Sequence, residues 1–145
     1  MSSAYNKFNS TMLECGKGIF NFLTDNCFIM LTNTLPVATN ALYGDISANE
    51  VASGNGYTTG GNAVTVTSFT QASGVAKLVL ANPANWTATG GSIGPFQYAV
   101  LYDATPTSPL KPLIGWWDYG AAVTLTTGEQ FAIALDGTNG VFTIT

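Results

Sequence analysis

The sequence contains neither histidine nor arginine, and its only basic residues are Lys7, Lys17, Lys77 and Lys111. Catalytic triads use histidine as the general base, so that mechanism is excluded. Clusters of arginine and lysine bind phosphate backbones, and four dispersed lysines therefore predict that the chain binds no nucleic acid. A structural zinc site needs four ligands from cysteine and histidine, a set that two cysteines and no histidine do not supply. We expect no catalytic residue, no metal and no cofactor.

Charge of either sign is scarce. Charged residues make up 8% of the chain and the net charge is −4, whereas about a quarter of a typical chain is charged. A dispersed monomer needs a charged surface, so a surface this poor in charge predicts that much of it is covered. A subunit of an assembly fits this composition best; a very stable β domain is the alternative.

Long hydrophobic runs and paired cysteines are also missing. No apolar stretch approaches the 18 or so residues of a membrane-spanning helix, so no membrane association is expected. The N-terminus lacks a basic stretch followed by an apolar one, and we expect no signal peptide. Cys15 and Cys27, the two cysteines, are then expected to be buried free thiols in a reducing cytoplasm.

Residues 1–26 differ from the rest of the chain. Apolar side chains recur there at spacings of three and four, the pattern of one stripe on an amphipathic helix: Phe8, Met12, Cys15, Ile19 and Phe22. Two interpretations stay open. The helix packs on the chain's own sheet, or it is an arm whose stripe, with Phe20 and Leu23, docks on a neighbouring subunit.

Residues 27–145 predict a β-sandwich. Residues 27–34 form an almost continuous apolar run, typical of a strand covered on both faces. Later segments alternate apolar and polar residues, with turn signals every eight to twelve residues; among these signals, Asp136-Gly137 and Asn139-Gly140 are typical of a β-hairpin. This pattern predicts a mainly β fold, an antiparallel β-sandwich or jelly roll with an N-terminal amphipathic helix or arm, and one domain overall.

The stretch from Gly90 to Tyr119 predicts two strands joined by a proline-rich loop. Trp116 and Trp117 must point to opposite faces of the returning strand, and the ring that faces outward indicates a contact surface. With Trp86, Tyr57 and Tyr119, these rings either stack on sugars or fill the core and subunit interfaces. Asp103 and Asp118 bracket the loop, but their positions are typical of turns rather than of a catalytic carboxylate pair.

Three motifs carry a resemblance to a known family: MLTNTLPVATN (30–40), GNGYTTGG (54–61) and IGWWDYG (114–120). With the sequence around them, from residue 5 to residue 144, the chain resembles small structural proteins of tailed bacteriophages and prophages. The resemblance implies a capsid cement, or decoration, protein with a jelly-roll fold and no enzymatic activity. It further implies a homodimer or homotrimer that is made in the bacterial host cytoplasm and binds the major capsid protein on the outer surface of the virion.

The hypothesis from sequence is therefore a cement protein that bridges neighbouring capsid subunits. The expected contact residues are Phe8, Met12, Ile19, Phe20, Phe22, Leu23, Trp116, Trp117 and Tyr119. Removing residues 1–24 is expected to abolish binding to the shell and to leave the sandwich folded. The alternatives are a carbohydrate-binding fibre module that uses its exposed aromatic rings, and a neck or tail component of the virion.

Overall fold

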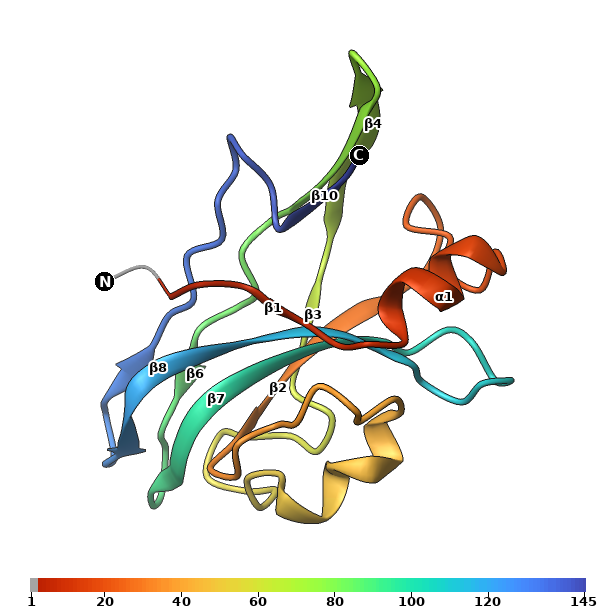
Figure 1. Ribbon diagram of the computed structural model, residues 1–145. Helices are drawn as coiled ribbons and strands as arrows, with labels where there is room; N and C mark the ends of the chain where they lie inside the picture. The colour runs from red at the N-terminus through yellow and green to blue at the C-terminus, as the bar shows by residue number, and fades with distance from the viewer. Residues whose placement is uncertain (1–2) are drawn as a thin grey trace.

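The computed structural model describes residues 3–145, and the fold is mainly β (Figure 1). The strands are β1 (Asn6–Lys7), β2 (Cys27–Thr32), β3 (Asn62–Val64), β4 (Val66–Ala72), β5 (Val75–Leu80), β6 (Trp86–Thr87), β7 (Ile93–Asp103), β8 (Leu113–Leu125), β9 (Gln130–Phe131) and β10 (Phe142–Ile144). The helical elements are short: α1 (Thr11–Gly16) and the 3-10 turns η1 (Tyr43–Asp45) and η2 (Ser47–Asn49). The predicted fold class is confirmed.

One layer is a five-stranded antiparallel sheet in the order β1-β8-β7-β2-β3. The apolar run predicted to be covered on both faces is β2, which lies between β7 and β3. Its alternation holds: Ile29 and Leu31 belong to one buried cluster, and Met30 belongs to another on the opposite face. The sheet therefore has apolar cover on both sides.

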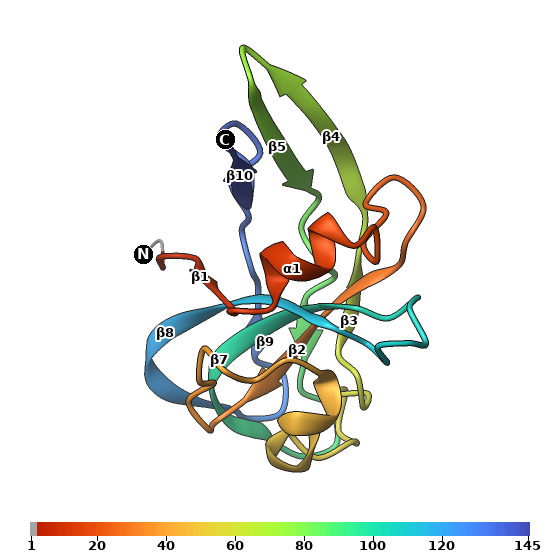
Figure 2. The same cartoon turned by 45° about the vertical axis from the view of Figure 1, so that its right-hand side comes forward.

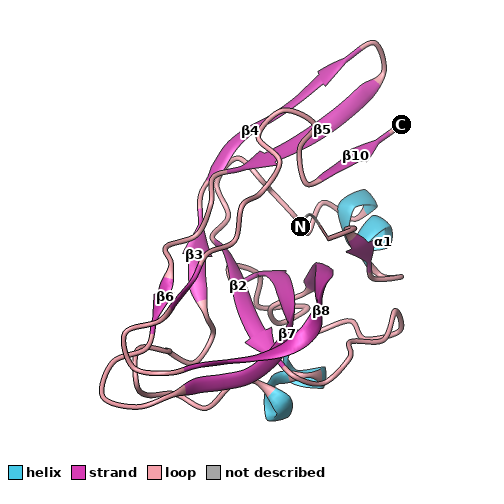
Figure 3. Cartoon of the chain, turned by 90° about the vertical axis from the view of Figure 1, so that its left-hand side faces the viewer, coloured by secondary structure: helices cyan, strands magenta, loops and turns pink. Residues whose placement is uncertain are grey.

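The second layer consists of two small antiparallel sheets. They are a sheet in the order β10-β5-β4 and the short pair β6-β9. Leu78 and Leu80 of β5 share the larger cluster with Ile29 and Leu31 of β2, so the main core lies between the layers, as in a β-sandwich. The β4–β5 hairpin extends beyond the five-stranded sheet at one end (Figures 2 and 3).

Two predicted strand arrangements differ from the structure. Residues 63–69 belong to the segments that alternate apolar and polar residues, but β3 belongs to the five-stranded sheet and β4 to the three-stranded one, so the chain changes layers near Thr65. The turn at residues 136–140 is present, with the Asp136 carboxylate accepting hydrogen bonds from the Thr138 and Asn139 amides. Its flanking strands do not form a hairpin, because β9 pairs with β6 and β10 with β5.

The N-terminal stripe is divided between the two faces of the sheet. Helix α1 has six residues, and Gly18, at φ +74°, lies in the turn that follows it. Phe8 precedes the helix and joins the outer cluster, whereas Phe20 and Phe22 follow it and join the main core. The segment crosses the edge of the sheet at β8, where the Thr11 hydroxyl donates to the Ile114 carbonyl at 2.8 Å. The predicted helix was too long, and the segment packs on its own sheet.

Candidate functional site

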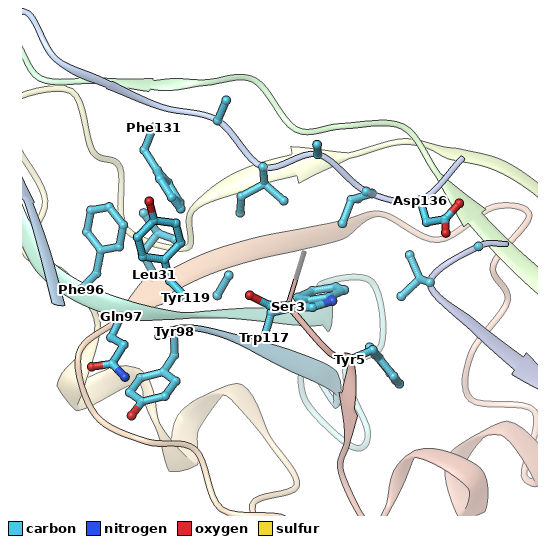
Figure 4. A pocket seen from close by; sticks show the side chains of 17 residues that line it. Ser3, Tyr5, Leu31, Phe96, Gln97, Tyr98, Trp117, Tyr119, Phe131 and Asp136 are labelled. Carbon is cyan, nitrogen blue, oxygen red and sulfur yellow. The ribbon is translucent and has the colours of Figure 1, made fainter. Parts of the chain in front are cut away.

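An aromatic cleft of about 360 Å³ lies between β7–β8, the N-terminal segment and residues 131–136 of the second layer (Figure 4). Six aromatic residues line it: Tyr5, Phe96, Tyr98, Trp117, Tyr119 and Phe131. Tyr5 meets Trp117 edge-on at 5.6 Å between ring centroids. Phe131 lies 4.9 Å from Phe96 and 5.5 Å from Tyr119, both in T-shaped contacts. The rings hold one another in place, which keeps the shape of the cleft.

A bulge in β8 brings Tyr119 to this cleft. The register pairs Tyr98 with Asp118 and then Phe96 with Val123, so four residues of β8 lie opposite one residue of β7. The Asp118 carboxylate fixes the bulge, because its Oδ1 accepts the Gln97 amide at 2.9 Å and the Gly120 N–H at 2.7 Å. Gly120 has φ +95°, a conformation that favours glycine. As a result the Tyr119 ring stays 46% exposed beside Phe131.

The cleft offers ring faces and few free polar groups. Asp136 lies at its far end, and its carboxylate is engaged by its own turn. Gln97 is engaged by Asp118 and points away from the rings (Figure 4). A site of this kind suits the stacking of a sugar ring or the burial of an apolar side chain.

Four of the nine predicted contact residues are buried within the chain itself: Phe8, Phe20, Phe22 and Trp116. The tryptophans do point to opposite faces, but the outward ring, Trp116, is covered by Phe8 at 4.6 Å. Met12, Ile19 and Trp117 are half-buried, while Leu23 and Tyr119 are exposed. The structure brings only Trp117 and Tyr119 together at the cleft.

The carboxylate next to Asp103 is Asp25, not Asp118. Asp118 pairs with Tyr98, five residues along β7 from Asp103, a separation of about 17 Å at the usual rise of a strand. Asp25 lies beside Asp103 instead, at the end of the sheet where Cys27 pairs with Asp103. Sequence spacing gave no signal for this pair, because the two residues are far apart in the chain.

A second polar cluster, around Glu50, was also missed. The Glu50 carboxylate accepts the Tyr57 hydroxyl at 2.7 Å, the Gly60 N–H at 2.6 Å and the Tyr43 hydroxyl. Burial raises the pKa of both tyrosines, so they remain donors. The Tyr57 oxygen also accepts the Leu31 N–H of β2 at 3.0 Å. These bonds fix the glycine-rich motif at residues 54–61 against the sheet, a structural role.

The cysteines are free, as predicted: Cys27 is buried and Cys15 is half-buried. Burial, with Asp103 and Asp25 nearby, raises the pKa of Cys27 to about 12. Within residues 3–145, no three side chains of the Cys, Asp and Glu types come together as a metal site would require. That same range holds no helix with the length and apolarity to cross a membrane.

Comparisons of this chain with protein-family models, with curated proteins and with solved structures found no match.

Proposed function

We propose that this chain is a non-enzymatic cement protein of a bacteriophage virion. It binds the major capsid protein on the outside of the head shell as a homodimer or homotrimer and stabilises the shell by bridging subunits. The resemblance of the three sequence motifs supports this role, and so does a surface poor in charge. A standard protein interface buries about 1,600 Å², so many such contacts around a shell add a large total stabilisation.

The observation that carries the proposal is a set of exposed leucines at one side of the molecule. Leu13, Leu23 and Leu110 are 57%, 72% and 56% exposed. They lie on α1, on the turn before β2 and on the loop between β7 and β8, which occupy the same side in Figures 1 and 2. The turn and the loop are joined, since the Ala104 N–H donates to the Asn26 carbonyl at 2.8 Å. We take this leucine side as the shell-binding surface.

The test is to add purified protein to mature capsids that lack it and to image the particles by cryo-electron microscopy. Regular density over the icosahedral lattice is expected, and Leu23→Asp is expected to remove it. Leu35→Asp is the matched control, because Leu35 is 58% exposed but follows the opposite end of β2. Density confined to the tail vertex would favour a neck or tail component instead, and absence of density would contradict the cement role.

A second candidate function is carbohydrate binding in a fibre, and the aromatic cleft favours it. Tyr119 and Trp117 present ring surface in a cleft large enough for a sugar ring. Binding on a glycan array is expected to be lost in Tyr119→Ala, whose ring is partly exposed and contributes little to the core. Leu110→Ala is the control for an exposed side chain outside the cleft. Silence of the wild-type protein on a broad array would exclude this function.

A further inference from the structure

Asp103 is the last residue of β7 and is fully buried, with 0% exposure. Its Oδ1 accepts the Thr105 N–H at 3.0 Å. Its Oδ2 is buried and accepts no hydrogen bond from the donors of residues 3–145. A buried carboxylate oxygen without a donor is costly when the group is ionised. This position therefore favours a neutral carboxyl group whose O–H donates a hydrogen bond to a neighbour.

Asp25 is that neighbour. Main-chain contacts bring it there: the Asn26 N–H donates to the Thr105 hydroxyl at 2.8 Å, and the Ala104 N–H donates to the Asn26 carbonyl at 2.8 Å. The Asp25 carboxyl group lies beside that of Asp103, and Asp25 Oδ2 accepts the Asn21 N–H at 2.8 Å. A hydrogen bond between two carboxyl groups requires that one of them carries a proton.

The surroundings of the pair supply no positive charge. From β2, the Cys27 thiol lies opposite Asp103, and it stays neutral because its own pKa is raised to about 12. From the loop after β7, Thr105 contributes its N–H and its hydroxyl. No lysine is among the described groups that act on Asp103. A second negative charge at this site would therefore meet only repulsion and burial.

We propose that Asp25 and Asp103 share one proton and form a pH-sensitive latch between the turn at residues 20–26 and the loop at residues 104–112. When the pair holds its proton, the bond between the carboxyl groups joins the two segments. When the proton leaves to solvent, two adjacent carboxylates, one of them fully buried, repel each other and the segments loosen. Because Leu23 and Leu110 lie on these segments, the latch controls the leucine side; that consequence, unlike the latch itself, rests on the proposed function.

The Asp25–Asp103 pair is expected to lose its shared proton near neutral pH. Burial first, and the hydrogen bond with Asp25 second, raise the pKa of Asp103 to about 7. A carboxyl group whose pKa is raised in the folded state stabilises the fold most below its unfolded pKa, and this stabilisation is lost as pH rises to the folded value. For this pair, the folding equilibrium constant is expected to fall on the order of 100-fold between pH 5 and pH 8.

The test compares chemical unfolding of the wild type and Asp103→Asn from pH 5 to pH 8. The wild type is expected to lose stability across this range, while the variant keeps a flat profile and becomes the more stable protein at pH 8. Asp118→Asn, which changes an exposed carboxylate on β8, is the matched control and should retain the wild-type slope. Equal slopes for the wild type and Asp103→Asn would overturn the latch.

A second measurement uses only the wild-type protein, and it tests the shared proton even if Asp103→Asn fails to fold. Carboxyl carbon resonances of the labelled wild-type protein are followed by NMR as pH is raised. One of the two aspartates is expected to titrate near pH 7. Above that pH, the backbone amides of residues 20–26 and 104–112 are expected to exchange faster with solvent, after correction for the intrinsic exchange rates. Titration of both carboxyl groups below pH 5 would refute the proposal.

Discussion

The packing of the N-terminal segment is best tested by replacing Phe8 with alanine. The Phe8 ring is 0% exposed and lies 4.6 Å from Trp116, in the cluster that covers the outer face of the sheet. A buried aromatic side chain removes roughly 150 Å² or more from water, which at about 25 cal/mol per Å² corresponds to about 4 kcal/mol. Measured losses for Phe→Ala in cores are about 3–5 kcal/mol. We expect a destabilisation of about 4 kcal/mol.

Urea unfolding measures this value. With a slope of about 2 kcal/mol per molar urea, the midpoint of Phe8→Ala is expected about 2 M below that of the wild type. Leu23→Ala is the control, because Leu23 belongs to the same segment but is 72% exposed, and its effect should stay within about 0.5 kcal/mol. A loss below about 1 kcal/mol in Phe8→Ala would refute the packing of this segment as part of the fold.

The same reasoning changes the deletion experiment. Removing residues 1–24 would take Phe8 from the outer cluster and Phe20 and Phe22 from the main core. Phe22 also contacts Phe142 of β10 at 5.8 Å. We expect the shortened chain to unfold, so its failure to bind a capsid would say nothing about an arm. Single substitutions of exposed leucines are the better test of the contact surface.

Three further predictions concern the core and the thiols. Gly61→Ala should lower the free energy of unfolding by at least about 2 kcal/mol, because Gly61 has φ +81° and a Cβ there would lie 1.9 Å from the Ile29 carbonyl oxygen. Gly137→Ala is the control in the same urea assay and should be close to neutral, because a Cβ at Gly137 would have no atom within 4 Å. Tyr57→Phe should cost about 1–3 kcal/mol, since it leaves the Leu31 N–H and Glu50 without their partner, whereas Tyr119→Phe should not. Iodoacetamide at pH 8 should modify Cys15 before Cys27, because Cys27 is fully buried and its pKa is raised to about 12. Mass spectrometry measures the rate of modification at each cysteine, and equal rates would contradict this prediction.

Periodicity determined the parts of the fold that depend on local pattern. The almost continuous apolar run at residues 27–34 predicted a strand covered on both faces, and the structure has β2 there. The adjacent tryptophans had to lie on opposite faces of β8 because side chains alternate along a strand. For the candidate site, the sequence singled out Trp117 and Tyr119. It did not indicate Tyr5 or Phe131, which reach the cleft from segments distant in the chain.

The sequence by itself determined the fold class and the free thiols, since the alternation of side chains and the small number of cysteines do not depend on tertiary contacts. Only the tertiary structure decided which partners those residues meet. It covered Trp116 with Phe8, moved the second strand of the predicted 136–140 hairpin onto β5, and placed Asp103 beside Asp25 instead of Asp118. Each of these depends on strand order and on the path of the chain around the sheet edge, and pairing between distant segments leaves no periodic signal in the sequence.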